Sequence, residues 1–455
     1  MTLLDAEAAV AAIRDVQPAW AARPVRERLA IVRRLRRLIA AECRKFAAAA
    51  VRPNMSEADI LVAEVMPLLS GCRFLEKYAS RVLALRRPSG GPPMWLRGTK
   101  IWVRRVPFGA VLILAPSNYP LFLPGVQAVQ AVVAGNGVMV KPAPGAAGAM
   151  LLLSDALQRA GLPEGLFAVL PDNDAAGAHA LRAGADKVVL TGGYDTGRRV
   201  LRELAETVTP AVMELSGDDA LVVLPGASID VVARAIVYGL MLNGGKTCIA
   251  PRRIIGVGET ARALVDRLEM LLAQLPLLQV DAGEMGRLRK ELAAAELAGS
   301  RVLGGRQGQG VEAMTRPVIV VASELAACLP PLFGPAASLL AVPDVDAAVE
   351  VANAGMHALG ASVFGPAAAA HAVARRLRAG CVSINGVIVP TADPRLPFGG
   401  ARASGFGATR GAEGLLEMTR PQAVVSRRRA VALQYRLLPN AAAPWVARGL
   451  RLLYG

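Results

Sequence analysis

Short apolar runs follow one another along the middle of the chain, beginning at Ala110. Four of them read AVLIL, GVMV, LFAVL and KVVL, and the stretches between them, 124–134, 145–160 and 174–183, are long enough for helices. Strands that are apolar on both faces and alternate with helices are typical of a parallel, doubly wound α/β sheet. Such sheets bind ligands at the carboxyl ends of their strands, so the residues after each run are candidates for a site.

The flanking regions have different patterns. Residues up to about Arg87 show apolar positions at helical spacing, and the cluster PSGGPP at 88–93 ends that pattern. Residues 95–106 alternate polar and apolar side chains, which predicts a strand or a projecting ribbon. After Glu214 a second series of strands and helices runs to about Gly380, followed by the glycine-rich segment LPFGGARASGFG. We therefore expect two α/β regions and a small β-element.

The segment 243–248, NGGKTC, permits two interpretations: GKT ends a phosphate-binding loop, or the cysteine is the reactive group. A phosphate-binding loop requires G-x-x-x-x-G-K-[ST] after a buried strand. Leu240 stands where the first glycine is required, and residues 228–245 have the apolar spacing of a helix. Both the spacing and the context argue against an ATPase, so Cys248 becomes the residue of interest.

Composition limits the class of partner. At 455 residues with 53% hydrophobic content, the chain is long enough for two or three folded domains. The formal net charge of +16 is compatible with a nucleic acid partner, but much of it lies on helices such as 31–39, whose arginines face outward. Because aromatic residues make up only 4% of the chain and no arginine run is interleaved with them, no nucleic acid partner is predicted.

The cysteines and apolar segments indicate the compartment. Five widely spaced cysteines without a C-x-x-C pair predict neither a disulfide framework nor a metal site. The first residues are acidic where a signal peptide is basic, and prolines interrupt the apolar region 106–140, so we expect a cytoplasmic protein without an integral membrane segment. The basic, amphipathic stretch 426–455 can touch a membrane surface, although a packed or subunit-contacting tail is the favoured interpretation.

Polar residues and glycines follow the apolar runs, where a site is expected. Asn118 stands in a turn fixed by two prolines directly after AVLIL, and Lys141 ends GVMV, where its charge can meet a ribose or a phosphate. The turn TGGYDTG at 191–197 joins a strand to a helix, a usual place for a pyrophosphate. No G-x-G-x-x-G occurs, and turn formation alone is the commoner explanation for each signal taken singly.

Together with the cysteine, these stretches form an ordered set of eight. They read VPFGAVLILAPSNYP, AVVAGNGVMVKP, VVLTGGYDTGRRV, MELSGDD, NGGKTC, LFGP, GCVSIN and LPFGGARASGFG. In order and approximate spacing the set resembles the aldehyde dehydrogenase superfamily across about residues 106–425, and the chain looks most like the shorter subgroup that includes fatty and aromatic aldehyde dehydrogenases. The resemblance implies a Rossmann-like cofactor domain, an α/β catalytic domain, a small bridging β-element and NAD or NADP as the cofactor.

The resemblance also implies roles for individual residues. Cys248 is the expected nucleophile, because a thiolate attacks an aldehyde carbon. Glu214 is the expected general base that activates water against the resulting thioester. Asn118 and the backbone N–H of Cys248 are the expected donors to the oxyanion. Cofactor contacts are expected from Lys141, Pro142, Gly192, Gly193, Gly197, Leu215, Phe333 and Phe398.

Several positions depart from the family pattern, among them Gly193 in place of serine and Gly217-Asp218 in place of Gly-Lys, and three further ones bear on the cofactor or the thiol. Pro144 and Pro331 stand where the family usually has glutamates that bind the two ribose groups. Each lost carboxylate removes an acceptor worth about 1.5–3 kcal/mol, so weaker cofactor binding is expected. Without a carboxylate at position 144, nothing there repels the 2′-phosphate of NADP. The sequence is therefore as compatible with NADP as with NAD. Lys246 stands where glutamine is usual, and a hypothesis is that its charge lowers the pKa of the Cys248 thiol.

The expected function is NAD(P)-dependent oxidation of an apolar, aliphatic or aromatic aldehyde to its carboxylate through a thiohemiacetal and a thioester. The alternatives are a coenzyme A-acylating aldehyde dehydrogenase or acyl reductase, and a catalytically impaired binding protein on the same fold. A homodimer joined through the ribbon is implied by the resemblance. The expected domains are a cofactor-binding domain at 1–94 and 107–214, a catalytic domain at 215–410, a bridging element at 95–106 and 411–430, and a basic tail at 431–455.

Overall fold

The computed structural model describes residues 5–93, 96, 98–305, 314–427 and 437–455. Trp95 of the predicted ribbon and residues 428–436 of the predicted bridging element and tail lie outside the described residues. The chain divides into two compact units. The larger comprises Met1–Leu83 and Val106–Arg420, and the smaller comprises Ala84–Arg105 and Pro421–Gly455.

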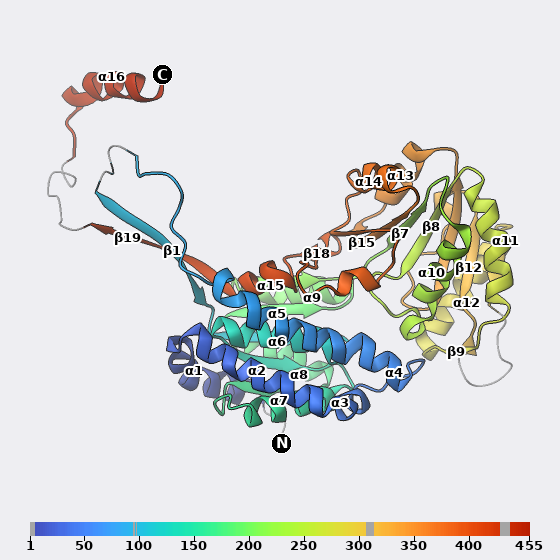
Figure 1. The fold of residues 1–455 in the computed structure, drawn as a ribbon, viewed down its shortest axis with the longest axis horizontal. Coiled ribbons are helices and arrows are strands. Elements are labelled where there is room, and N and C mark those ends of the chain that lie inside the picture. The colour runs from blue at the N-terminus through green and yellow to red at the C-terminus, as the bar shows by residue number, and fades with distance from the viewer. Residues whose placement is uncertain (1–4, 94–95, 97, 306–313, 428–436) are drawn as a thin grey trace. The chain divides into compact units, whose positions relative to one another are not determined.

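A six-stranded sheet forms one half of the larger unit (Figure 1), in the order β18-β6-β5-β2-β3-β4. The five strands from β2 to β6 are parallel, and β18 joins the edge antiparallel to β6. The four apolar runs predicted as strands are β2 to β5, so the prediction of a parallel, doubly wound sheet is confirmed. The bounds are β2 Ala110–Leu114, β3 Gly137–Lys141, β4 Phe167–Val169, β5 Lys187–Thr191, β6 Ala211–Glu214 and β18 Gly405–Phe406.

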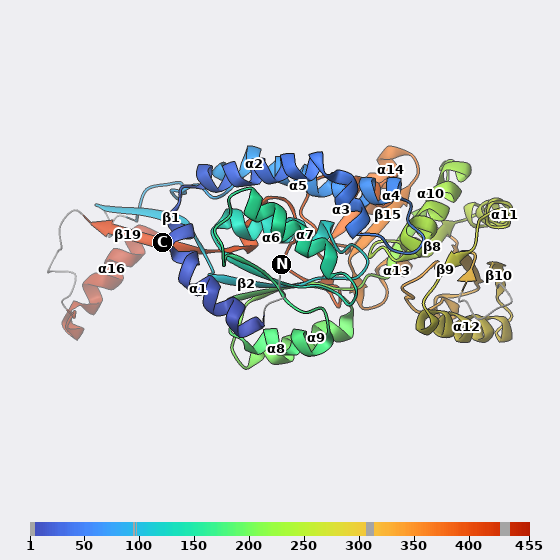
Figure 2. The same ribbon diagram turned by 90° about the horizontal axis from the view of Figure 1, so that it is seen from below.

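Helices cover both faces of this sheet because alternate strand residues point to opposite sides. Val111 and Ile113 of β2 belong to the core formed with α2, α5, α6 and α7, whereas Leu112 and Leu114 belong to the core formed with α1, α8 and α9. In Figure 2, helices α2, α5, α6 and α7 lie on one side of the sheet, and α1, α8 and α9 lie on the other. Their bounds are α1 Ala6–Ala22, α2 Val25–Ala41, α5 Met66–Val82, α6 Phe122–Ala134, α7 Ala147–Arg159, α8 Asp174–Arg182 and α9 Tyr194–Ala205.

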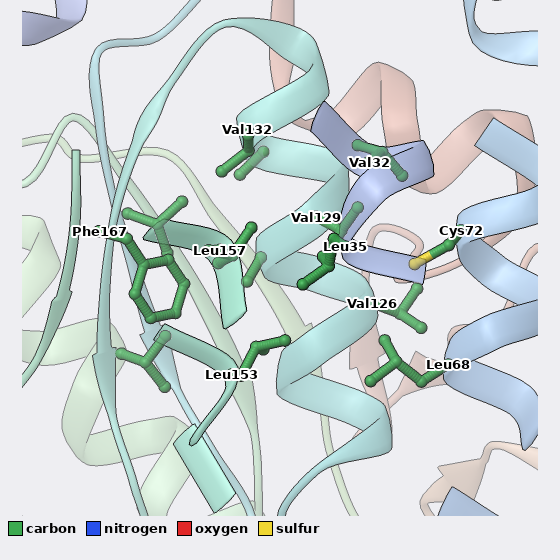
Figure 3. Packing of buried hydrophobic residues seen from close by; sticks show 14 of the residues in the cluster. Val32, Leu35, Leu68, Cys72, Val126, Val129, Val132, Leu153, Leu157 and Phe167 are labelled. Carbon is green, nitrogen blue, oxygen red and sulfur yellow. The ribbon is translucent and has the colours of Figure 1, made fainter. Parts of the chain in front are cut away.

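The fully buried helix α6 lies at the centre of the first core. Figure 3 shows its residues Val126 and Val129 among Leu35 of α2 and Leu68 of α5. All thirteen residues of α6 are buried, including Gln127 and Gln130, so this helix has no face exposed to solvent. The predicted helical N-terminal region thus packs over the strands that carry the polar turns.

A seven-stranded sheet forms the other half of the larger unit, in the order β10-β12-β13-β8-β7-β15-β16. Helices α10 (Ile229–Met241) and α11 (Thr260–Leu272) cover one face, and α13 (Val345–Asn353) and α14 (Ala367–Ala374) cover the other. Helix α12 (Ala282–Leu297) packs beside this sheet against the loop that holds Leu332. The strands are β7 Asp219–Val223, β8 Pro251–Val257, β10 Arg301–Gly304, β12 Val318–Ala322, β13 Ala336–Val342, β15 Gly360–Phe364 and β16 Cys381–Ile384.

The smaller unit holds a two-stranded sheet and a terminal helix. Strands β1 (Thr99–Pro107) and β19 (Thr419–Arg427) pair with each other, as the alternation at 95–106 predicted for a ribbon. Helix α16 (Ala443–Tyr454) follows, and none of its residues is buried. Among the described residues, no helix combines the length and the apolar character needed to cross a membrane.

Candidate active site

A cavity of about 540 Å³ lies where the carboxyl ends of β5 and β6 meet the segment that carries Cys248. We call it the central cavity. Seven of the eleven residues predicted for the site line it, and four do not. Those lining it are Asn118, Gly192, Gly193, Glu214, Leu215, Cys248 and Phe333. The structure therefore brings together the three predicted catalytic residues from three separate segments of the chain.

Cys248 follows α10 through a tight turn that only this sequence pattern allows. Asn243, Gly244 and Gly245 have φ values of 54°, 61° and 74°, a region that favours glycine and tolerates asparagine. A Cβ on Gly245 would overlap the backbone of Gly334, so the turn packs directly on the neighbouring loop. Arg252 holds the turn from inside by donating to the carbonyl of Gly245 at 2.6 Å. The cysteine is thus presented by a rigid loop.

The electrostatic surroundings of Cys248 favour the neutral thiol. Burial raises its pKa, and the carboxylates of Glu214 and Asp219 raise it further, while Arg410 acts in the opposite direction. Lys246 does not contribute, because its Nζ is held by Asp281 Oδ2 at 2.8 Å. The hypothesis that Lys246 lowers the thiol pKa finds no support in this arrangement and stays a prediction.

Glu214 ends β6 and is held in the sheet by β18, whose Gly405 lies opposite it. Only 1% of its surface is exposed. Its Oε2 accepts a hydrogen bond from Thr409 Oγ1 at 2.7 Å, whereas Oε1 has no partner among the described residues. Burial raises the pKa of Glu214, and Thr409 and Arg410 oppose that rise. One oxygen is thus anchored, and the other is a buried acceptor that has no hydrogen-bond partner among the described residues.

Asn118 is tied directly to the loop that carries the cysteine. Its side-chain Nδ2 donates to the backbone carbonyl of Lys246 at 2.9 Å. Its backbone carbonyl accepts from Asn243 Nδ2 at 2.8 Å. The next residue, Tyr119, forms a hydrogen bond of 2.8 Å with Thr247 Oγ1. A primary amide carries two N–H groups, so one bond to Lys246 leaves a second donor. The turn after β2 and the cysteine loop therefore form one hydrogen-bonded assembly.

A buried ion pair supports this assembly from the N-terminal helices. Glu64 is fully buried, and its Oε1 accepts from Arg52 Nη1 at 2.7 Å. Arg52 in turn donates through Nε to Asn243 Oδ1 at 2.9 Å. The other oxygen of Glu64 accepts from the backbone N–H of Phe122, the first residue of α6, at 2.6 Å. Burial raises the pKa of Glu64 to about 7, while Arg52 acts to lower it.

Sequence reasoning missed this ion pair. Glu64 lies in a π-helical turn, Leu61–Val65, a feature that is frequent at functional sites but has no clear sequence signature. Glu64 and Arg52 look like two of many charges in an arginine-rich helical region. Only the packing of that region over α6 distinguishes them.

The turn after β5 has the form expected of an anion-binding site. Gly193 is the N-cap of α9 and has no side chain with which to cap the first N–H groups of that helix. A Cβ on Gly193 would meet only Ser216 Oγ, at 4.0 Å, which leaves the backbone open to a ligand. Gly197 does not line the central cavity; a Cβ there would lie 2.6 Å from Leu215 Cδ1, so it allows α9 to pack close to β6.

Three other predicted cofactor residues lie outside the lining of the central cavity. Lys141 and Pro142 stand at the end of β3 and are buried, and burial lowers the pKa of Lys141. Phe398 is 2% exposed and packs with Ile249, and the guanidinium carbon of Arg410 lies 4.2 Å from its ring centroid. Their assignment to the cofactor remains a prediction.

The opposite wall of the central cavity carries polar residues that sequence reasoning did not single out. Glu284 and Arg287 of α12 line it together with Pro331, and they form an ion pair at 3.3 Å with each other. Glu284 also lines a small cavity with Leu332 and Gly334, so its helix lies against the loop that begins at Pro331. No local pattern marks Glu284, because its position depends on how α12 packs on that loop.

Comparisons with known proteins show what the chain as a whole is similar to. The profile of the aldehyde dehydrogenase family matches residues 1–424. A Mycobacterium tuberculosis protein named "Putative succinate-semialdehyde dehydrogenase NADP(+) 2" is 31% identical over 445 residues, covering 94% of this chain and 85% of the relative. The 4,4'-diapolycopene aldehyde oxidase of Methylomonas is 31% identical over 389 residues, covering 81% and 72%. A crystal structure of a Mycobacterium tuberculosis aldehyde dehydrogenase complexed with NAD+ superposes with a TM-score of 0.87 at 22% identity, covering 95% and 92%, which confirms the predicted fold.

Proposed function

Because the chain belongs to the aldehyde dehydrogenase family, we propose that it oxidises an apolar aldehyde to its carboxylate through a covalent intermediate on Cys248. The family match confirms the predicted class of enzyme, and the nucleotides named for its relatives agree with NAD or NADP as the cofactor. The observation that carries the proposal is the meeting of Cys248, Glu214 and Asn118 in one cavity, with one carboxylate oxygen of Glu214 free.

The first step is attack of the Cys248 sulfur on the aldehyde carbon, which forms a thiohemiacetal. Since burial raises the thiol pKa, the proton must leave as the bond forms, and the free Oε1 of Glu214 is the proposed acceptor. The aldehyde oxygen becomes an oxyanion, for which the second amide N–H of Asn118 and the N–H of Cys248 are the proposed donors. Asn118 is rigid because its other contacts bind it to the cysteine loop.

The residues of the central cavity fit a nicotinamide dinucleotide. The uncapped N-terminus of α9 at Gly193 suits its pyrophosphate. Pro331 has no acceptor for a ribose hydroxyl, so we propose that Glu284 supplies the carboxylate from the other side of the cavity. A bound nicotinamide would supply a hydride acceptor, and loss of the hydride from the thiohemiacetal carbon would leave the thioester.

The second step is hydrolysis of the thioester: once the proton taken from Cys248 has passed to solvent, Glu214 is the base that removes a proton from water, and the Cys248 sulfur is the leaving group. A buried carboxylate whose pKa is raised is a stronger base than one in solution, and its free oxygen can hold the water. This favours water over coenzyme A as the acyl acceptor. The apolar cluster of Ile249, Leu359 and Phe398, against which Cys248 packs, supports an apolar substrate.

The proposal extends to the roles of the domains and to the oligomeric state. Residues 1–94 and 107–214 would form the cofactor-binding domain, and residues 215–410 the catalytic domain. The ribbon of β1 and β19 would join two copies into a homodimer, which light scattering of the purified chain tests.

The test of function is cofactor reduction by purified protein with a panel of aliphatic and aromatic aldehydes, using NAD and NADP separately. We expect reduction that depends on aldehyde and is abolished in Cys248→Ala. The matched control is Cys381→Ala, which removes a second partly buried thiol outside the central cavity and should retain most activity. Aldehyde-dependent reduction that persists in Cys248→Ala would refute the assignment of the nucleophile.

A further inference from the structure

Helix α16 presents an unpartnered amphipathic surface. None of its twelve residues is buried, and Trp445 and Leu452 are 73% and 84% exposed. At 100° per residue, Trp445, Leu452, Leu453, Val446 and Leu450 fall on one side of the helix, whereas Arg448 and Arg451 fall together on the other. A stripe of five exposed apolar side chains on a helix of twelve residues marks an interaction surface.

We propose that α16 docks this protein onto an anionic lipid surface, lying in the plane of the interface. Residues 418–455 contain seven arginines and no aspartate or glutamate, so the segment is attracted to negatively charged headgroups. On α16 itself, Arg448 and Arg451 would meet the same charges on a second copy of the helix, which disfavours pairing of two such helices. Charge complementarity therefore favours an anionic surface over self-association as the partner of the apolar stripe.

The dimensions of α16 decide between lying on a membrane and spanning it. Twelve residues form a helix of about 18 Å, shorter than the hydrocarbon core of about 30 Å. Trp445 and Tyr454 have apolar rings with a polar edge, which suits the boundary between headgroups and acyl chains. The helix thus has the length, aromatic residues and basic face of an interfacial helix rather than of a membrane span.

The proposed catalytic function does not account for this helix. Residues 425–455 follow the span matched by the family profile, and α16 contributes no residue to the central cavity. Binding to lipid is thus separable from aldehyde oxidation, and each can fail without the other.

The test is sedimentation of the full-length protein with phosphatidylcholine vesicles, with and without one third phosphatidylglycerol. We expect binding to the anionic vesicles only, weakening as salt rises because the attraction between charges is screened. The variant Trp445→Ser/Leu450→Ser/Leu453→Ser removes the stripe, and Arg448→Gln/Arg451→Gln removes the helix charge. Each should lose about tenfold or more in affinity, whereas Arg448→Lys/Arg451→Lys should keep most of it.

The control is Leu297→Ser, which removes a large side chain that is 91% exposed at the end of α12. It should bind vesicles like the parent protein. Equal binding to both kinds of vesicle, no binding to either, or unchanged binding by the triple serine variant would each overturn the proposal. So would light scattering in which the triple serine variant forms a smaller oligomer than the parent, since the stripe would then serve a second copy.

Discussion

The hydrogen bond from Thr409 to Glu214 sets the basicity of the proposed general base. Thr409→Val keeps the shape of the side chain and removes the hydroxyl that donates to Oε2 at 2.7 Å. Because this bond favours the charged carboxylate, its loss raises the pKa of Glu214 above the already raised value. A buried hydrogen bond to a charged group is worth about 1.5–3 kcal/mol, and one pH unit corresponds to about 1.4 kcal/mol. The pH midpoint of deacylation should therefore rise by about one to two units.

The assay isolates the hydrolytic step by loading Cys248 with p-nitrophenyl acetate, which forms a thioester without hydride transfer. Hydrolysis of the acyl-enzyme is then followed against pH in single turnovers. The base must be deprotonated to act, so the rate rises through the midpoint as pH increases, and in Thr409→Val the whole rise should move to higher pH.

Two controls accompany this measurement. Thr409→Ser retains a hydroxyl and should restore the parent midpoint. Thr260→Val removes a threonine hydroxyl that donates to the carbonyl of Val257 at 2.9 Å, away from the central cavity, and should leave the midpoint unchanged. If Thr409→Val deacylates with the parent pH profile while Glu214→Gln does not deacylate, the proposed coupling between Thr409 and Glu214 is refuted.

Three further predictions concern the buried ion pair, the reactivity of the thiol and the binding of the cofactor. Arg52→Leu leaves Glu64 buried without its charge partner and should lower the free energy of unfolding by about 3–5 kcal/mol in urea denaturation. Alkylation of Cys248 by iodoacetamide should accelerate about tenfold per pH unit between pH 7 and pH 9, because the thiol pKa is raised, and Lys246→Gln should leave this profile unchanged. Glu284→Gln should raise the KM for the cofactor about tenfold in steady-state kinetics, with little change in the KM for aldehyde.

Each of these outcomes has a matched comparison. Arg44→Leu breaks an exposed ion pair with Glu57 and should change stability little. An alkylation rate of Cys248 that already reaches its plateau below pH 7 would contradict the raised thiol pKa. Pro331→Glu introduced into Glu284→Gln should recover cofactor affinity if the two positions serve the same ribose; no recovery, together with an unaltered KM in Glu284→Gln, would exclude the proposed role of Glu284.

The sequence predicted the parts of the fold that local pattern determines. Apolar runs located β2 to β5 because buried parallel strands have few other compositions, and ordered motifs located Cys248, Glu214 and Asn118. Strand β18 was not predicted as a strand, because two residues of a glycine-rich segment carry no periodicity. The ion pair of Lys246 with Asp281 was not predicted, because distance along the chain does not give the direction of a side chain.

The residues that support the site were not predictable for a related reason. Thr409 lies 195 positions from Glu214 and Arg52 lies 191 positions from Asn243, so no window of sequence contains both partners. Their roles arise only when the folded backbone brings them together. A single sequence therefore identifies the groups that carry the proposed chemistry more readily than the groups that hold them in position.

The pairing of β18 with β6 also has a consequence for synthesis of the chain. Glu214 pairs with Thr191 of β5 on one side, but its partner on the other side, Gly405, is made only after nearly nine-tenths of the 455 residues, so this edge of the sheet closes late. Contacts of such long sequence separation form late and slowly. A ribosome-bound chain can assemble β2 to β5 early, but the proposed base stays unanchored until the end of translation. The nascent protein therefore acquires the sheet proposed to bind the nucleotide well before it completes the site proposed for hydrolysis.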